Sequence, residues 1–524
     1  MNSWGHAFDA WGQSFVTDGA GGEGINYLVV GGYYLTSQGP NVARILQGLN
    51  PGSPKFCGLE IISGRHFPPE WQGDLITSDF RGHRVCRFKL QDDGSSYASR
   101  EQEPLIRSTH PAFRPIDAKM GPDGALYIAD WYNPIIQHGE VDFRDPRRDK
   151  THGRIWRVTA KNRPLVPWPK LEGASVPELL EALKAPEDFT RQMAKRVLVE
   201  RGKDVVAPEL RRWAAALPEG ADAARLEATW VAQGLGDVAG VTNLFPRLAG
   251  SKDFRVRAAA VRVLGQMLEP VAAKSPLFDV YHDAAVIDEH PRVRLEGVRA
   301  LAARNTPKAA ELATLVLDKS MDRTLDYALW LTLRELEPVW MPEFKAGKLT
   351  FGGDPKKLAF ALNAVGSADA VKPVLALIEG GTVPAANRYG LWLLLARVGG
   401  PDELVKVLDF ADKVDNVTPA QRVELVAAVE ESIRTRRVPK PRNEVNLFHL
   451  IDEISNGTNP ESRGAARAAC RILALWKEEN TRPGIESIAR RDKDVPSADR
   501  AARSAPSNWR SARPSRSWLA PGCS

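Results

Sequence analysis

The side chains best suited to chemistry are concentrated between residues 130 and 154, where carboxylates alternate with histidines and arginines. His138 and His152 are the candidate catalytic residues, because a neutral imidazole can accept a proton near neutral pH. The oxygen ligands that a hard cation such as Ca²⁺ prefers are offered by Asp130, Asn133 and Asp142. The guanidinium groups that would hold a polar or anionic substrate are those of Arg144, Arg147 and Arg154.

His83 and Arg84 follow an earlier strand of the same kind and are expected to reach the same face, where they would add to the substrate-binding groups. Apolar residues fill strand interiors, so charged groups of this kind are presented by the loops between strands. The alternative is a loop that pairs its own charges and binds nothing, and the sequence leaves both interpretations open.

Short β-strands are the elements that would position these residues. Residues 1–165 contain apolar runs broken by Gly, Pro and Asp, and one strand pattern that ends in an aspartate recurs at 14–18, 75–79 and 126–130. Second strand-like runs follow at 83–88 and 153–158. A four-stranded blade of a β-propeller uses about 40 to 50 residues, so this segment predicts about three blades. We therefore expect the C-terminal part of a β-propeller.

From residue 175 to residue 480 the apolar spacing takes the period of an α-helix, with Gly or Pro breaks between helices. One position of this repeat is mostly arginine, at Arg191, Arg225, Arg257, Arg294, Arg388, Arg422 and Arg463, with Asp326 and Leu358 as the exceptions. The repeat resembles the HEAT type, so we expect an α-solenoid and a β plus α multidomain fold. The arginines are expected to bond carbonyls or carboxylates of neighbouring repeats rather than to form a binding stripe.

Of the net charge of +6, +5 lies in residues 489–524, where eight Lys and Arg residues face three Asp residues. Residues 485–524 are predicted to form a disordered basic tail. The remaining chain has no basic run with interleaved aromatic residues, so we expect no nucleic-acid partner. No apolar run is long enough for a transmembrane segment, and the first residues lack the features of a secretory signal.

Cysteine spacing argues against a zinc site and against covalent haem, because no CxxC or CxxCH occurs among Cys57, Cys86, Cys470 and Cys523. Cys57 and Cys86 lie in predicted strands. They either pair in an oxidising compartment or remain two buried free thiols, and the second interpretation is favoured.

Several runs resemble the membrane-bound dehydrogenase family that carries a PVC-type haem-binding CxxCH module. They are WGH at 4–6, WGQ at 11–13, LNPGSPK at 49–55 and DFRGHRV at 79–85. The longest is GPDGALYIADWYNP at 121–134, which continues through HGEVDFRDPRR at 138–148 to HGR at 152–154. The similarity extends over residues 2–165.

This resemblance implies the propeller of glucose or sorbosone dehydrogenases, followed by HEAT-like repeats and a cytochrome c module. It implies an exported, periplasmic or cell-surface oxidoreductase that acts on a sugar or polyol and passes electrons to c-type haem, with Ca²⁺ or a quinone as further cofactor. The carbohydrate-like small molecule would bind at the propeller face. Because this chain contains no CxxCH, we expect a fragment without the haem module and upstream blades. The alternative is a non-catalytic scaffold whose solenoid holds a protein partner.

Overall fold

The computed structural model describes residues 2–19, 23–34, 44–50, 55–267, 283–366, 370–380, 385–413, 417–441, 447 and 460–476. Strands are followed by helices, so the chain is a β plus α multidomain protein, as the sequence predicts. Two compact units meet between Leu349 and Thr350. The change from strands to helices lies inside the first unit. The predicted basic tail and Cys523 lie outside the described residues.

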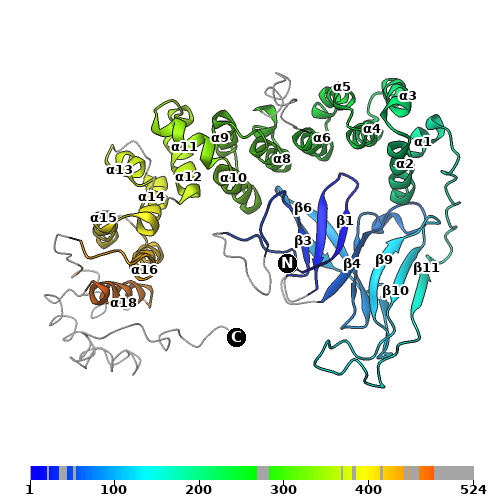
Figure 1. The fold of residues 1–524 in the computed structure, drawn as a ribbon, viewed down its shortest axis with the longest axis horizontal. Helices are drawn as coiled ribbons and strands as arrows, with labels where there is room; N and C mark the ends of the chain where they lie inside the picture. The colour runs from blue at the N-terminus through cyan, green and yellow to red at the C-terminus, as the bar shows by residue number, and fades with distance from the viewer. Residues whose placement is uncertain are drawn as a thin grey trace. The chain divides into compact units, whose positions relative to one another are not determined.

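Three antiparallel sheets open the first unit (Figure 1). The first consists of β1 (Ser3–Phe8), β2 (Ser14–Asp18) and β3 (Ile25–Tyr27). The second runs in the order β4 (Phe56–Ile61), β5 (Leu75–Asp79), β6 (Arg84–Asp93) and β7 (Ser96–Glu101), with β8 (Ile106–Arg107) beside β6. The third contains β9 (Pro115–Met120), β10 (Leu126–Asp130) and β11 (Arg154–Val158). The three strands predicted to end in aspartate are β2, β5 and β10, with the predicted bounds.

Packing between the sheets is mostly apolar. The strands β1, β4 and β9, which begin the three sheets, lie next to one another. Phe15 and Tyr27 of the first sheet meet Tyr97 of the second in edge-on ring contacts. The core between the second and third sheets includes Ile62, Phe67, Ile76, Val85, Leu126 and Ile128. This burial leaves the loops between strands to carry the polar groups.

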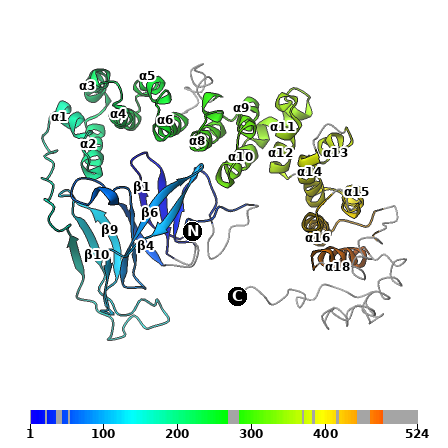
Figure 2. The same cartoon turned by 180° about the vertical axis from the view of Figure 1, so that it is seen from behind.

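Helices of the first unit follow as a row of antiparallel pairs, and Figures 1 and 2 show α2, α4, α6, α8 and α10 on the side of the row that faces the sheets. The bounds are α1 (Val176–Ala182), α2 (Asp188–Arg201), α3 (Lys203–Ala216), α4 (Asp222–Gly234), α5 (Val238–Ala249), α6 (Phe254–Gln266), α8 (Pro291–Ala302), α9 (Pro307–Ala313), α10 (Arg323–Glu335) and α11 (Glu337–Lys345). Local sequence sets their starts. Ser175 and Glu178 form a capping box on α1, and Asp253 accepts a hydrogen bond from Arg255 N at the start of α6.

The recurring arginines are structural in the first four copies. Each donates hydrogen bonds to two backbone carbonyls in the turn before its own helix: Arg191 to Ala185 and Pro186, Arg225 to Leu217 and Pro218, Arg257 to Ser251 and Lys252, and Arg294 to Asp288 and Glu289. Arg191 and Arg257 also reach carboxylates farther along the chain, Glu227 and Asp288. The bonds to Glu227 and Asp288, and that of Arg294 to Ser320 O, reach the following copy of the repeat, as predicted. The bonds to carbonyls of the preceding turn are additional to the prediction.

Polar contacts join the sheets to the inner helices. Arg292 of α8 has a fully buried side chain that donates to Asp92 Oδ1 at 2.6 Å and to Ser96 O. Its guanidinium carbon lies 3.8 Å from the centre of the Tyr97 ring, at the distance of a cation–π contact. Other contacts of this kind join Arg65 to Glu187, Ser95 to Asp322 and Arg299 to Val30 O. Directional polar contacts therefore join the sheets to these helices.

The second unit contains further helices, α12 (Pro355–Val365), α13 (Val371–Glu379), α14 (Ala385–Val398), α15 (Pro401–Asp412), α16 (Pro419–Arg436) and α18 (Pro460–Leu475). Thr418 and Gln421 form a capping box at the start of α16, which packs against its neighbours α14, α15 and α18.

Short 3-10 helices occur in both units, at Pro69–Trp71, Thr314–Asp318 and Phe351–Gly353. Within the described residues, no helix combines the length and the apolar character needed to cross a membrane.

Cys57 and Cys86 are buried free thiols, so the disulfide alternative is not formed. Cys57 lies in β4 and Cys86 in β6, two strands that both pair with β5. Burial raises the pKa of each thiol to about 12, because the thiolate would lose its hydration. These cysteines therefore act as small apolar core residues.

Candidate functional site

Asp130 is buried at the end of β10, and both of its carboxylate oxygens already accept hydrogen bonds. Oδ1 accepts from the backbone N–H groups of Arg114 (2.8 Å) and Tyr132 (3.0 Å). Oδ2 accepts from Arg154 Nε (2.9 Å) and Trp156 Nε1 (3.0 Å). Burial alone would raise the pKa of Asp130, but these donors outweigh it and hold the pKa below its ordinary value. A cation at Asp130 would have to compete with four donors.

Asn133 and Asp142, the other predicted cation ligands, are also engaged. The buried Asn133 accepts from Ile135 N at 3.2 Å and donates to Asp149 O at 3.2 Å. The exposed Asp142 accepts from Arg144 N at 2.7 Å. In the part of the chain that the structure describes, no three His, Cys, Asp or Glu side chains are grouped as metal ligands. The cation site remains a prediction.

His152 forms a pair with Asp149 in the loop before β11. Its Nδ1 lies 2.8 Å from Asp149 Oδ2, and its backbone N–H donates to Asp149 Oδ1 at 2.9 Å. Hydrogen bonds, of which the strongest comes from Thr151 N, lower the pKa of Asp149 to about 2. In the tautomer with a proton on Nδ1, the carboxylate orients the ring and leaves the Nε2 lone pair free to accept a proton. This pair is open to solvent, since 68% of the His152 side chain is exposed.

Tyr132 brings His152 and Arg154 together. The guanidinium carbon of Arg154 lies 3.9 Å from the centre of the Tyr132 ring, and the His152 ring meets the same ring edge-on at 5.9 Å.

The other predicted groups are placed elsewhere on the surface. Arg147 pairs with Asp145, Arg84 pairs with Asp79 and Glu101, and His138 and Arg144 are exposed. Among the described residues, no hydrogen bond or ion pair links these four to His152.

Arg114 is a residue that sequence reasoning missed. It is buried, and its side chain donates to Asn133 O at 2.9 Å while Nη1 lies 3.2 Å from His83 Nε2. Because its backbone N–H also binds Asp130, Arg114 connects the loop of His83 with the loop after β10. His83 and the loop after β10 are therefore linked by a buried arginine that no local motif marks.

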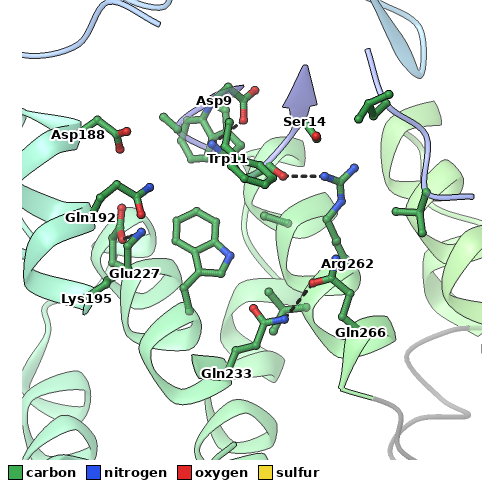
Figure 3. A pocket seen from close by; sticks show the side chains of 18 of the residues that line it. Asp9, Trp11, Ser14, Asp188, Gln192, Lys195, Glu227, Gln233, Arg262 and Gln266 are labelled. Atoms are coloured by element: carbon green, nitrogen blue, oxygen red, sulfur yellow. Dashed lines mark hydrogen bonds and ion pairs between the residues drawn. The ribbon is translucent and has the colours of Figure 1, made fainter. Parts of the chain in front are cut away.

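A cavity of about 840 Å³ lies between the β1–β2 turn and the inner helices α2, α4 and α6. Figure 3 shows Asp9 and Trp11 of the turn above the side chains of Lys195, Glu227 and Arg262. The helical wall also includes Asp188, Gln192, Arg196, Glu200, Trp230, Gln233, Ala259 and Gln266. We call this cavity the sheet–helix groove.

The junction between α4 and α6, which borders the groove, lacks the ion pair that joins α6 to α8. Between α6 and α8, Arg262 Nη2 donates to Glu296 Oε1 at 2.6 Å. The corresponding positions between α4 and α6, counted from the recurring arginine of each helix, hold Trp230 and Ala259. A methyl group in place of a carboxylate leaves space, and an indole in place of a guanidinium gives that space a flat apolar wall. Ala259 and Trp230 both line the groove.

The β1–β2 turn approaches the helices closely at Gly12. Its φ of +74° lies in the left-handed region, and an added Cβ would stand 3.2 Å from Trp230 Cζ2, so only glycine suits this position. Arg262 Nη1 donates to Gly12 O at 2.6 Å and fixes the turn above the groove. At the other side, Gln233 donates to Gln266 at 2.9 Å between α4 and α6 (Figure 3).

Asp9 holds the shape of the turn from within. Its Oδ1 accepts from Trp11 N (2.9 Å) and Gln13 N (2.8 Å), and its Oδ2 accepts from Tyr97 OH (2.9 Å). Burial raises the pKa of Asp9 in spite of these donors. The guanidinium of Arg255 lies 4.5 Å from the centre of the Trp11 ring and steadies the indole beside the groove. The groove could not be read from sequence because its walls come from residues 8–34 and 188–266, which lie far apart along the chain.

Comparisons with known proteins give one family match, to the first part of the chain. A family model described as a domain of unknown function (DUF7133) matches residues 1–162. Two solved structures show similarity, an oxidoreductase (glucose dehydrogenase) from Thermus thermophilus and a glucose dehydrogenase, with TM-scores of 0.23 and 0.22. Each is 22% identical and covers 30% of this chain, which spans 44% of the length of either protein. No match was found among the curated proteins.

Proposed function

We propose that this chain binds a sugar or polyol in the sheet–helix groove. The observation that carries the proposal is that Trp230 and Ala259 line the groove beside amide side chains, at positions where the next junction holds the ion pair of Arg262 and Glu296. The C–H face of a sugar ring packs on an indole, and its hydroxyls need partners that both donate and accept. Gln192, Gln233 and Gln266 supply such groups. The volume suits a ligand larger than one sugar ring, because drug-sized ligands occupy cavities of about 300 to 1,000 Å³.

The first test closes the groove with an ion pair copied from the next junction. In the double variant Trp230→Arg with Ala259→Glu, a guanidinium and a carboxylate would take the places that Arg262 and Glu296 take between α6 and α8. Glycans that bind the parent are identified on an array of immobilised glycans, and their affinity is measured by calorimetry. The double variant should bind them at least about tenfold more weakly, with an unchanged circular dichroism spectrum. Trp168→Ala is the control, because Trp168 is 68% exposed and does not line the groove. Binding that survives in the double variant, or a parent that binds no glycan, would refute the proposal.

Oxidation of a sugar or polyol is the second candidate function, and the His152–Asp149 pair favours it. His152 Nε2 would take the hydroxyl proton, while the electrons leave through a cofactor and a c-type haem supplied outside this chain. The protein would then be periplasmic or on the cell surface, with its three sheets as propeller blades and its helices as a HEAT-like solenoid. The adjacency of β1, β4 and β9 supports the propeller assignment. A protein partner on the helical row is the alternative.

His152→Gln tests the oxidation proposal in the protein extended by its flanking gene sequence. Sugar-dependent reduction of an artificial electron acceptor should fall at least about a hundredfold, because general-base catalysis supplies this order of rate enhancement. Lys150→Gln is the comparison, since Lys150 is exposed in the same loop and is not one of the predicted site residues. Equal losses in both variants, or loss of thermal stability that parallels the loss of rate, would count against a catalytic His152.

A further inference from the structure

We infer that the sheet–helix groove selects uncharged glycans and rejects those that carry a carboxylate or a free amine. The inference rests on the proposed sugar-binding function of the groove. It depends on a feature of the lining, where charged side chains are numerous but are neutralised by one another. A charged group on a ligand loses its water when it enters the groove, and this loss is costly. An unpaired charge of opposite sign in the groove would be needed to offset it.

The cations on the α2 wall are already occupied. Lys195 Nζ lies 2.7 Å from Glu227 Oε2, and Arg191 Nε donates to Glu227 Oε1 at 2.9 Å. The Lys195 ammonium also lies 4.6 Å from the centre of the Trp230 ring, which holds it against the indole. An anionic ligand would have to compete with Glu227, a carboxylate that is buried and already in place.

On the opposite wall, every guanidinium nitrogen of Arg262 is engaged. Nε donates to Glu296 at 3.0 and 3.1 Å, Nη1 donates to Gly12 O, and Nη2 donates to Gln13 Oε1 at 2.9 Å as well as to Glu296. Only 9% of the Arg262 side chain is exposed. This arginine therefore holds the turn against the helices, and it has no pair of N–H groups left to bind a ligand carboxylate.

The carboxylates of the lining are satisfied in the same way. Asp188 pairs with Arg191 at 2.9 Å, and Glu200 pairs with Arg196 at 2.8 Å. Asp9 is bound by the turn and by Tyr97. An ammonium group would meet carboxylates that already have partners. The groups that remain for a ligand are the Gln192 amide, the ends of the Gln233 and Gln266 amides that do not bond each other, and the two indoles. These groups match hydroxyls and C–H faces rather than charges.

The experiment compares glycans of equal length on one array, in neutral, uronate-containing and free-amine forms, with the purified full chain as the probe. We expect the charged forms to bind at least about tenfold more weakly than the neutral form at low salt. Glu200→Gln should then raise uronate binding severalfold, because it leaves Arg196 at the groove without its carboxylate. Glu209→Gln is the matched control, since it frees Arg212 in the same way on α3, away from the lining residues.

The outcomes separate this inference from the function on which it rests. If no glycan of any class binds, the proposed sugar-binding function is wrong and the inference falls with it. If glycans bind but uronates or amines bind as tightly as neutral forms, the function stands and the selectivity is refuted. If the parent discriminates but Glu200→Gln and Glu209→Gln behave alike, the discrimination does not come from the paired charges of the groove, and the inference is also refuted.

Discussion

Replacement of Arg292 by methionine should loosen the joint between the sheets and the helices. Methionine keeps most of the aliphatic volume but removes the charge and the donors that reach Asp92 and Ser96 O. It also removes the cation–π contact with Tyr97. Because the Asp92 side chain is 45% exposed, that carboxylate can regain water and its ion pair contributes little to the loss.

The expected cost is about 3 kcal/mol in the free energy of unfolding. Loss of the stacked guanidinium contributes about 1 kcal/mol, and the two carbonyl hydrogen bonds, to Ser95 and Ser96, contribute about 1 kcal/mol each. Arg212→Met is the control, because Arg212 is 72% exposed and its described ion pair is with Glu209 of its own helix. That change should cost less than about 0.5 kcal/mol.

Urea unfolding of the full chain, followed by tryptophan fluorescence, measures both values. Hydrogen exchange supplies the second readout, because amides of β7 and of α8 should lose protection together in Arg292→Met if sheets and inner helices open as one unit. A loss below about 1 kcal/mol would refute the assigned role of Arg292. Faster exchange confined to α8 would refute the shared opening.

Asp130→Asn should cost about 2 kcal/mol at neutral pH, because one amide oxygen cannot replace the two oxygens that accept from four donors. Since folding lowers the pKa of Asp130, its carboxylate stabilises the fold above the ordinary pKa, and this stabilisation is lost as the pH falls through the folded value. Urea unfolding at pH 7 and at pH 3 should therefore show a smaller difference between parent and variant in acid, and a constant difference would contradict this. Cys57 and Cys86 should resist brief alkylation in the native state, as read by mass spectrometry, because burial raises their pKa to about 12; rapid labelling would show that they are accessible. The chain expressed as written should bind no covalent haem, since it has no CxxCH, and a pyridine haemochrome band from denatured protein would disprove this.

Local patterns predicted the elements of this protein well. The strands at 14–18, 75–79 and 126–130 were predicted with the bounds of β2, β5 and β10, because β-prone residues end there at an aspartate and a turn. The Asp253 cap of α6 and the structural use of the early recurring arginines also follow from sequence. Such features depend on neighbours within a few residues of one another, which sequence displays directly.

Contacts between distant segments could not be predicted in this way. Arg114 joins two loops through carbonyls and a histidine, and nothing near it in sequence identifies those partners. The groove depends on how Gly12 meets Trp230, which are separated by most of the first unit. Charge density alone was also an incomplete guide, because the charged loop after β10 is exposed over much of its length while the sheet–helix groove lies between the turn and the helices.

The polar contacts between the sheets and the inner helices limit which insertions and deletions this sequence can tolerate. Apolar surfaces can slide past each other by one helical turn and still bury similar area, whereas hydrogen bonds and stacked guanidinium groups have directions that allow one alignment. The contacts of Arg292 with Tyr97 and of Arg299 with Val30 O fix such an alignment along the inner helices. A single-residue deletion in α8 would rotate one of these partners away by about 100°, since a helix turns once every 3.6 residues. The outer helices α3 and α5 make no hydrogen bond to the sheets in the contacts described, so insertions and deletions should accumulate there while the inner row keeps its spacing.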